Sequence, residues 1–138
     1  FSAIGLSILI DLLQIDQQFI QVIEPGHIQY ISSLIKTQSQ SYILNAMQLC
    51  ACIFEQNIVE LENEITNTNL LIYAPMYVSG LPEPTVYVLF LAISNNLGKL
   101  LEMWGKDFEQ TLELGLEELS YSTNDSLLNL AEEISTRL

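Results

Sequence analysis

Apolar side chains recur three and four residues apart along most of the chain, which is the spacing of one face of an α-helix. The clearest such face lies within residues 41–54 and comprises Ile43, Ala46, Met47, Cys50, Ile53 and Phe54. Leu44 and Leu49 lie off this face, so we expect this helix to be buried on two sides. The pattern recurs over residues 86–97 and 127–138 and again near the start of the chain. The chain is therefore predicted to be all-α.

Glycine and proline residues separate the predicted helices. They occur at Pro25-Gly26, Gly80–Pro84, Gly98 and Gly105. Pro84 suits the first turn of a helix, where the missing N–H of proline is not needed. Ser122–Asp125 offers N-cap side chains to the last helix. These breaks divide the chain into groups of two or three helices.

Equivalent positions recur at a spacing of about 42 residues. Ile28, Leu70 and Leu112 each lie in a short helix that precedes a long one. A period near 40 residues with two or three helices per unit is typical of armadillo and HEAT repeats. We therefore predict a right-handed α-α superhelix, an armadillo/HEAT-type solenoid of about three repeats, because such units bury their apolar faces only by stacking. The predicted elements are the third helix of one repeat at 1–15 and further repeats at about 16–55, 56–97 and 98–138.

Two parts of the chain resemble known repeat families. Residues 23–53 look like an armadillo repeat, with Gly26 opening a helix and Ala46-Met-Gln-Leu49 in the third helix. Residues 86–97, 108–119 and 124–134 resemble the last repeats of importin-α (karyopherin-α). This resemblance implies an adaptor for nuclear protein import, present in cytoplasm and nucleus, that binds basic nuclear localisation signals or a transport receptor. The alternative is a general armadillo/HEAT scaffold in trafficking, ciliary or cytoskeletal complexes.

The resemblance also implies a peptide-binding groove on the third helices. Importin-α-type repeats hold extended basic peptides with a W-x-x-x-N pair, whose Asn binds the peptide backbone and whose Trp forms a slot for Lys and Arg. Here Asn95 occupies the Asn place and Leu91 the Trp place. The last importin-α repeats also lack the pair and contact the export receptor instead. The candidate groove residues are Asn95, Leu91, Ser94, Gln48, Cys52 and Asp11.

Asn95 and Asn96 are the sharpest candidates for a polar role. Both fall inside the helix predicted for residues 86–97, where Asn competes for the helix backbone. We expect the amide of Asn95 to bond either a bound peptide or a carbonyl of a neighbouring helix, since buried amides nearly always find a partner.

The charge of the chain limits its partners. The chain has 17 acidic residues against four basic ones, a formal net charge of −13, which should repel nucleic acid and anionic membrane surfaces. A basic protein or peptide is the electrostatic match, although acidic surface also serves solubility alone. No run of residues approaches the length of a membrane span, so we expect no membrane insertion. A solenoid cut through a repeat exposes an apolar end, so we also expect self-association through helix 1–15.

No catalytic or metal-binding motif stands out. His27, the only histidine, follows a turn glycine, where surface or capping roles are common, and has no metal-ligand partner at suitable spacing. Cys50 and Cys52 point in different directions along a helix, so we expect core packing rather than a disulfide, and a reducing, intracellular setting. The adjacent glutamates diverge, and Trp104 suits packing. We therefore expect a non-enzyme with no cofactor and no metal.

Overall fold

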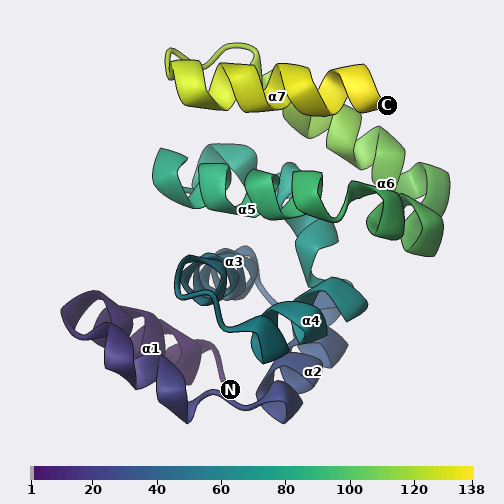
Figure 1. Cartoon of the computed structure of the whole chain (residues 1–138). Coiled ribbons are helices and arrows are strands. Elements are labelled where there is room, and N and C mark those ends of the chain that lie inside the picture. Colours follow the sequence, from purple (N-terminus) through teal and green to yellow (C-terminus); the bar gives the residue numbers. More distant parts are fainter. Residues whose placement is uncertain (1) are drawn as a thin grey trace. The chain divides into compact units, whose positions relative to one another are not determined.

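The computed structural model describes residues 2–138, except for the side chain of Ala3, so Phe1 of the predicted first helix lies outside the described residues. No strand occurs in this described part, which confirms the all-α prediction. Figure 1 shows the helices in chain order. The elements are α1 (Ala3–Ile15), η1 (Gln17–Val22), α2 (Pro25–Leu34), η2 (Ile35–Thr37), α3 (Gln40–Glu55), α4 (Val59–Asn67), η3 (Leu70–Tyr73), η4 (Pro75–Gly80), α5 (Glu83–Asn95), α6 (Leu97–Leu119) and α7 (Asp125–Arg137), where η denotes a 3-10 helix.

Side-chain caps fix where α3 and α7 begin. The hydroxyl of Ser39 accepts a hydrogen bond from the backbone N–H of Tyr42 at 3.3 Å, at the start of α3. The side chain of Asn124 accepts from Ser126 N–H at 3.0 Å and from Leu127 N–H at 3.2 Å, at the start of α7. These bonds satisfy backbone donors that have no partner inside the helix. The N-cap predicted for the last helix is therefore confirmed.

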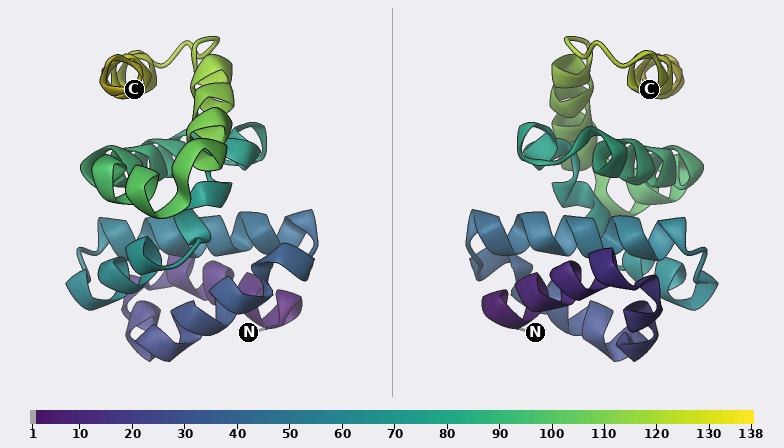
Figure 2. Two further views of the ribbon diagram at one scale, coloured as in Figure 1. Left: turned by 90° about the vertical axis from the view of Figure 1, so that its right-hand side faces the viewer. Right: turned by 90° about the vertical axis from the view of Figure 1, so that its left-hand side faces the viewer.

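The chain divides into two compact units, residues 1–70 and residues 71–138. In the first unit, α3 packs against α1 and α4, and α2 packs against α4. Both views of Figure 2 show α3 as a long helix lying across the rest of this unit. Two side-chain hydrogen bonds add to the apolar contacts, one from Gln29 to Glu64 at 3.1 Å and one from Ser32 to Asn69.

The second unit is built from η4, α5, α6 and α7. The helices α5 and α7 lie side by side, and α6 packs against α7 and η4. Gly115 of α6 lies so close to η4 that a Cβ atom added there would come within 2.8 Å of the Pro75 side chain. Arg137, at the end of α7, donates hydrogen bonds to the carbonyl and hydroxyl oxygens of Ser94 in α5 at 3.0 and 2.9 Å. These two hydrogen bonds join the C-terminal ends of α5 and α7.

One of the predicted breaks falls elsewhere. Gly98 does not end a helix, because it lies in the first turn of α6 with ordinary helical neighbours. The break falls at Asn96, whose backbone (φ −119°, ψ 17°) leaves the helical region and separates α5 from α6. Gly105 does interrupt α6, with φ of 67°, which is a conformation that glycine adopts without steric cost.

The helices predicted near 1–15, 41–54, 86–97 and 127–138 correspond to α1, α3, α5 and α7. The boundary between the two units, however, falls inside the repeat predicted at 56–97. The reason is that α4 buries Leu61 and Ile65 in the first unit, against α2 and α3, whereas η4 packs against α6 in the second unit.

Candidate protein-binding surface

In the second unit, Leu91 and Asn95 lie one turn apart on the same side of α5, and both are exposed. Tyr87 extends this side by one more turn. We call Tyr87, Leu91 and Asn95 the α5 stripe. It combines an aromatic ring, an aliphatic side chain and an amide on one open surface. The opposite side of α5 is buried and includes Phe90 and Ile93.

Asn95 is the last residue of α5 rather than a mid-helix residue. Its side chain makes no hydrogen bond within the described part of the chain. The neighbouring Asn96 instead turns its side-chain N–H back onto the Ala92 carbonyl at 2.8 Å and so closes the end of α5. The two asparagines therefore differ: Asn96 ends the helix, and the amide of Asn95 faces solvent.

In the first unit, Gln48 and Cys52 lie one turn apart on a partly exposed side of α3. Asn45 precedes them on this side, and the exposed Glu55 follows them. We call Asn45, Gln48, Cys52 and Glu55 the α3 stripe. Here the two positions predicted from the repeat pattern again share one surface, with amides and a carboxylate beside them.

Ser94 does not join the α5 stripe. It is buried, and both its carbonyl and its hydroxyl oxygen accept hydrogen bonds from Arg137. A residue directly before Asn95 points about 100° away from it around the helix axis. Ser94 therefore holds α7 in place, and its inclusion among the groove residues is corrected.

Asp11 is not brought together with the α3 stripe. The buried side of α1 packs against α3, and Asp11 is exposed on the opposite side of α1. The prediction placed it in the groove by counting back from later repeats. That count cannot tell which side of a helix faces its neighbour.

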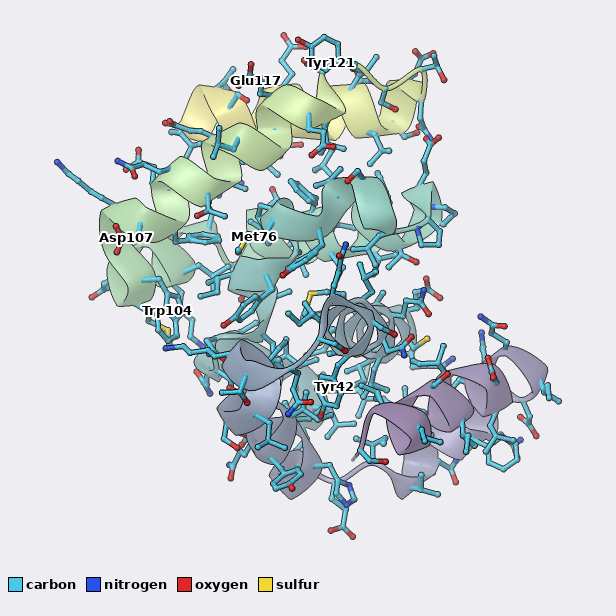
Figure 3. All side chains as sticks on the ribbon, turned by 180° about the vertical axis from the view of Figure 1, so that it is seen from behind. Tyr42, Met76, Trp104, Asp107, Glu117 and Tyr121 are labelled. Carbon is cyan, nitrogen blue, oxygen red and sulfur yellow. The ribbon has the colours of Figure 1, made fainter. Side chains whose placement is uncertain are left out.

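A third surface was missed by the sequence reasoning. A shallow groove of about 440 Å³ runs between α6 and α7 and is lined by Glu113, Leu116, Glu117, Ser120, Ser135 and Leu138. Glu113 and Glu117 lie one turn apart and therefore share a side of α6. Figure 3 labels Glu117, near the C-terminal end of α6, and Tyr121, in the turn that follows α6. The four-residue spacing of Glu113 and Glu117 in the sequence is the signal that indicates this acidic side.

The two cysteines are free thiols, and Cys50 is buried in α3. Burial, and to a smaller extent the neighbouring Cys52, raises the pKa of the Cys50 thiol to about 12. Burial, then the nearby Glu55, also raises the pKa of Cys52. Both effects oppose formation of the reactive thiolate. Core packing, as predicted, is therefore the role that the structure gives Cys50.

This burial predicts slow chemistry at Cys50. At pH 8 we expect iodoacetamide to modify Cys50 in urea but hardly at all in the folded chain, as read by mass spectrometry of its peptide. The raised folded-state pKa also means that Cys50 favours folding below about pH 9 and loses this contribution as the pH rises toward 12. Equal modification rates in buffer and in urea would contradict the buried position.

The remaining candidate residues have structural roles. The ring Nδ1 of His27 accepts a hydrogen bond from the Glu24 backbone N–H at 3.0 Å, which confirms a capping role at the start of α2. Trp104 is half-buried, and its indole N–H is buried without a hydrogen-bond partner among the described residues. Figure 3 shows Trp104 and Asp107 in the first part of α6, on the two sides of the bend at Gly105.

The described residues contain no cluster of His, Cys, Asp or Glu that is arranged to hold a metal ion. Among the helices of residues 2–138, none combines the length and the apolar character that crossing a membrane requires. No family model, curated protein or solved structure matches the chain. The open stripes on α3 and α5 are therefore the features on which a functional proposal rests.

Proposed function

We propose that this chain is a segment of an armadillo-type solenoid that binds an extended, basic stretch of another polypeptide. One observation carries the proposal. On both α3 and α5, the two positions that importin-α-type repeats use for binding peptide are one turn apart and outside the core: Gln48 and Cys52 are partly exposed, and Leu91 and Asn95 are exposed. Positions selected only for packing would be expected in the core instead.

The α5 stripe has suitable chemistry for an extended peptide. The Asn95 amide carries both a donor and an acceptor, so it can pair with the C=O and N–H of one peptide residue. Leu91 and the ring of Tyr87 offer apolar surface for the methylene stem of a Lys or Arg, and the Tyr87 ring can also attract its cationic end. The exposed Glu83 lies one turn before Tyr87 on the same side.

The α3 stripe offers a related but weaker surface for an extended peptide. Asn45 and Gln48 supply amides, and Glu55 supplies a carboxylate at the end of the helix. The net charge of −13 favours approach of a cationic segment to either stripe. Since the Trp of the family pair is replaced by Leu91 and Gln48, we expect each stripe to bind a basic peptide less tightly than a complete pair would.

By this proposal the chain serves as an importin-α-like adaptor of nuclear protein import, active in cytoplasm and nucleus, whose partner is a basic signal or a transport receptor. The second candidate is a general armadillo/HEAT scaffold in trafficking, ciliary or cytoskeletal complexes. The replacement of Trp by Leu91 is the observation behind this second candidate, because a leucine lacks the aromatic face that attracts a cation and can equally contact an apolar partner. The two candidates differ in their salt dependence: binding of a basic signal should weaken as salt concentration rises, whereas binding of an apolar partner should not.

The test is a titration of the chain into a fluorescent, extended peptide rich in Lys and Arg, followed by anisotropy. We expect saturable binding that Asn95→Ala weakens about three- to tenfold, which corresponds to one or two hydrogen bonds. The control is Asn129→Ala, an exposed asparagine on α7 outside the stripes. Equal affinities of the Asn95→Ala variant and the unmodified chain would contradict the role of the α5 stripe.

A further inference from the structure

A pocket of about 280 Å³ lies within the second unit, where the segment that joins η4 to α5 meets the turn that joins α6 to α7. Glu83, Glu118 and Tyr121 line it, and all three are exposed. We call it the turn pocket. Its lining falls between positions 78 and 127 of the chain. The buried side chains of the lining are all apolar and include Leu81, Val86 and Leu127.

Tyr121, labelled in Figure 3, lies in a turn that is held by its own hydrogen bonds. Its backbone N–H donates to the Glu118 carbonyl at 3.3 Å, and the Ser122 N–H donates to the Leu119 carbonyl at 3.0 Å. The Ser122 hydroxyl accepts from the Asn124 N–H at 3.0 Å. The backbone that carries the exposed ring is therefore already ordered, which lowers the entropic cost of binding a ligand there.

The charges of the turn pocket favour a cationic occupant. Neither the Glu83 nor the Glu118 carboxylate has an ion-pair or hydrogen-bond partner within the described residues. Over residues 2–138, no Lys, Arg or His contributes to the lining. The net charge of −13 also attracts cations to the chain. The counter-charge must therefore come from a partner.

Among cationic groups, an arginine side chain matches this lining best. Its planar guanidinium donates several hydrogen bonds to carboxylates and stacks on an aromatic ring such as that of Tyr121. Its methylene stem can cover the apolar floor of the pocket. A lysine ammonium can pair with the same carboxylates, but it is compact and strongly hydrated and gains less from the ring.

The size and position of the turn pocket indicate a polypeptide as the source of the arginine. Pockets for small molecules usually measure about 300–1,000 Å³, so about 280 Å³ suits one side chain better than a whole ligand. Glu83 lies one turn before Tyr87, on the side of α5 that carries the α5 stripe. We propose that the turn pocket binds one arginine side chain of a partner polypeptide. The proposal rests on the proposed function, because this polypeptide is the one that the α5 stripe holds.

The probes are three fluorescent, extended peptides of one sequence that carry Arg, Lys or Leu at the same positions. By anisotropy, we expect the chain to bind the Arg peptide about three- to tenfold more tightly than the Lys peptide, and the Leu peptide least. Glu118→Gln and Tyr121→Leu should each remove most of the preference for Arg over Lys. Circular dichroism checks that both variants fold, which is expected because both side chains are exposed.

Glu117→Gln is the matched control, because it makes the same change of charge at an adjacent exposed residue that does not line the turn pocket. It should keep the preference for Arg. Asn95→Ala should weaken binding of the Arg and Lys peptides alike and keep their ratio.

Equal binding of the Arg and Lys peptides would overturn the turn pocket and leave the proposed function standing, whereas binding of neither would overturn both. A preference for Arg that survives both Glu118→Gln and Tyr121→Leu would place the arginine elsewhere. Tightest binding of the Leu peptide would make the occupant apolar.

Discussion

The Gly115→Ala variant is expected to destabilise the second unit by about 1–3 kcal/mol, because a single methyl group would overpack the contact between α6 and η4. The new Cβ would come within 2.8 Å of Pro75 Cβ, 2.9 Å of its carbonyl oxygen and 3.0 Å of its Cα. Two of these three atoms belong to the backbone, and the proline ring is rigid, so none can move aside cheaply. Relief requires α6 and η4 to separate.

Urea denaturation followed by Trp104 fluorescence measures this effect, since the chain has one Trp and it lies in the second unit. Gly98→Ala is the matched control, because Gly98 is also in α6 but has open space around it. There we expect unchanged or increased stability, by up to about 1 kcal/mol, from the better helix propensity of Ala. Similar urea midpoints for Gly115→Ala and the unmodified chain would refute the close approach of α6 to η4.

Phe90→Ala is expected to cost about 3–5 kcal/mol in the same unit, enough to unfold it in a marginally stable chain. Phe90 is 0% exposed and lies on the buried side of α5, between the positions of the α5 stripe in sequence. The substitution removes a large buried ring and leaves a cavity that the neighbouring helices fill only partly.

The neighbouring residue provides the control for Phe90. Leu91 is 39% exposed, so Leu91→Ala should lose much less stability while it changes the α5 stripe. Thermal unfolding by circular dichroism, with Trp104 fluorescence in parallel, compares the two variants. If Leu91→Ala were less stable than Phe90→Ala, α5 would present its opposite side to solvent.

Much of the fold follows from the sequence because helical spacing reports directly on helices. The buried set of α3 includes Ile43, Ala46, Met47, Cys50 and Ile53, which the spacing selected. The cap at Asn124 and the bend at Gly105 were likewise readable, since each depends on local chemistry. Such features need no knowledge of the neighbouring helices.

The sequence alone does not determine which side of α1 is buried. Ile4 and Ile8 fit a helical face as well as Leu9 and Leu13 do, so spacing alone cannot decide which pair is buried. The structure buries the leucines and exposes the isoleucines. Tertiary contact with α3 makes this choice, and it places Asp11 on the exposed side of α1 rather than in the predicted groove.

Prediction of the candidate binding surface from the sequence was limited in the same way. Leu91 with Asn95, and Gln48 with Cys52, share sides because their four-residue spacing is fixed by helix geometry. Ser94 was misplaced because its burial depends on Arg137, which lies at the far end of the second unit in sequence. Asn96 was wrongly predicted to lie inside a helix. The end of α5 depends on the hydrogen bond from its side chain to the Ala92 carbonyl, which no residue pattern predicts.

The most direct test of the central claim is a salt series of peptide binding to the whole chain. The Lys/Arg-rich peptide and a matched peptide with Gln at every basic position are each titrated by anisotropy at rising salt concentrations. If the stripes on α3 and α5 bind basic polypeptide, the basic peptide should bind more tightly at low salt and lose this advantage as salt screens the charges. Equal affinities for the two peptides at all salt concentrations would contradict the account.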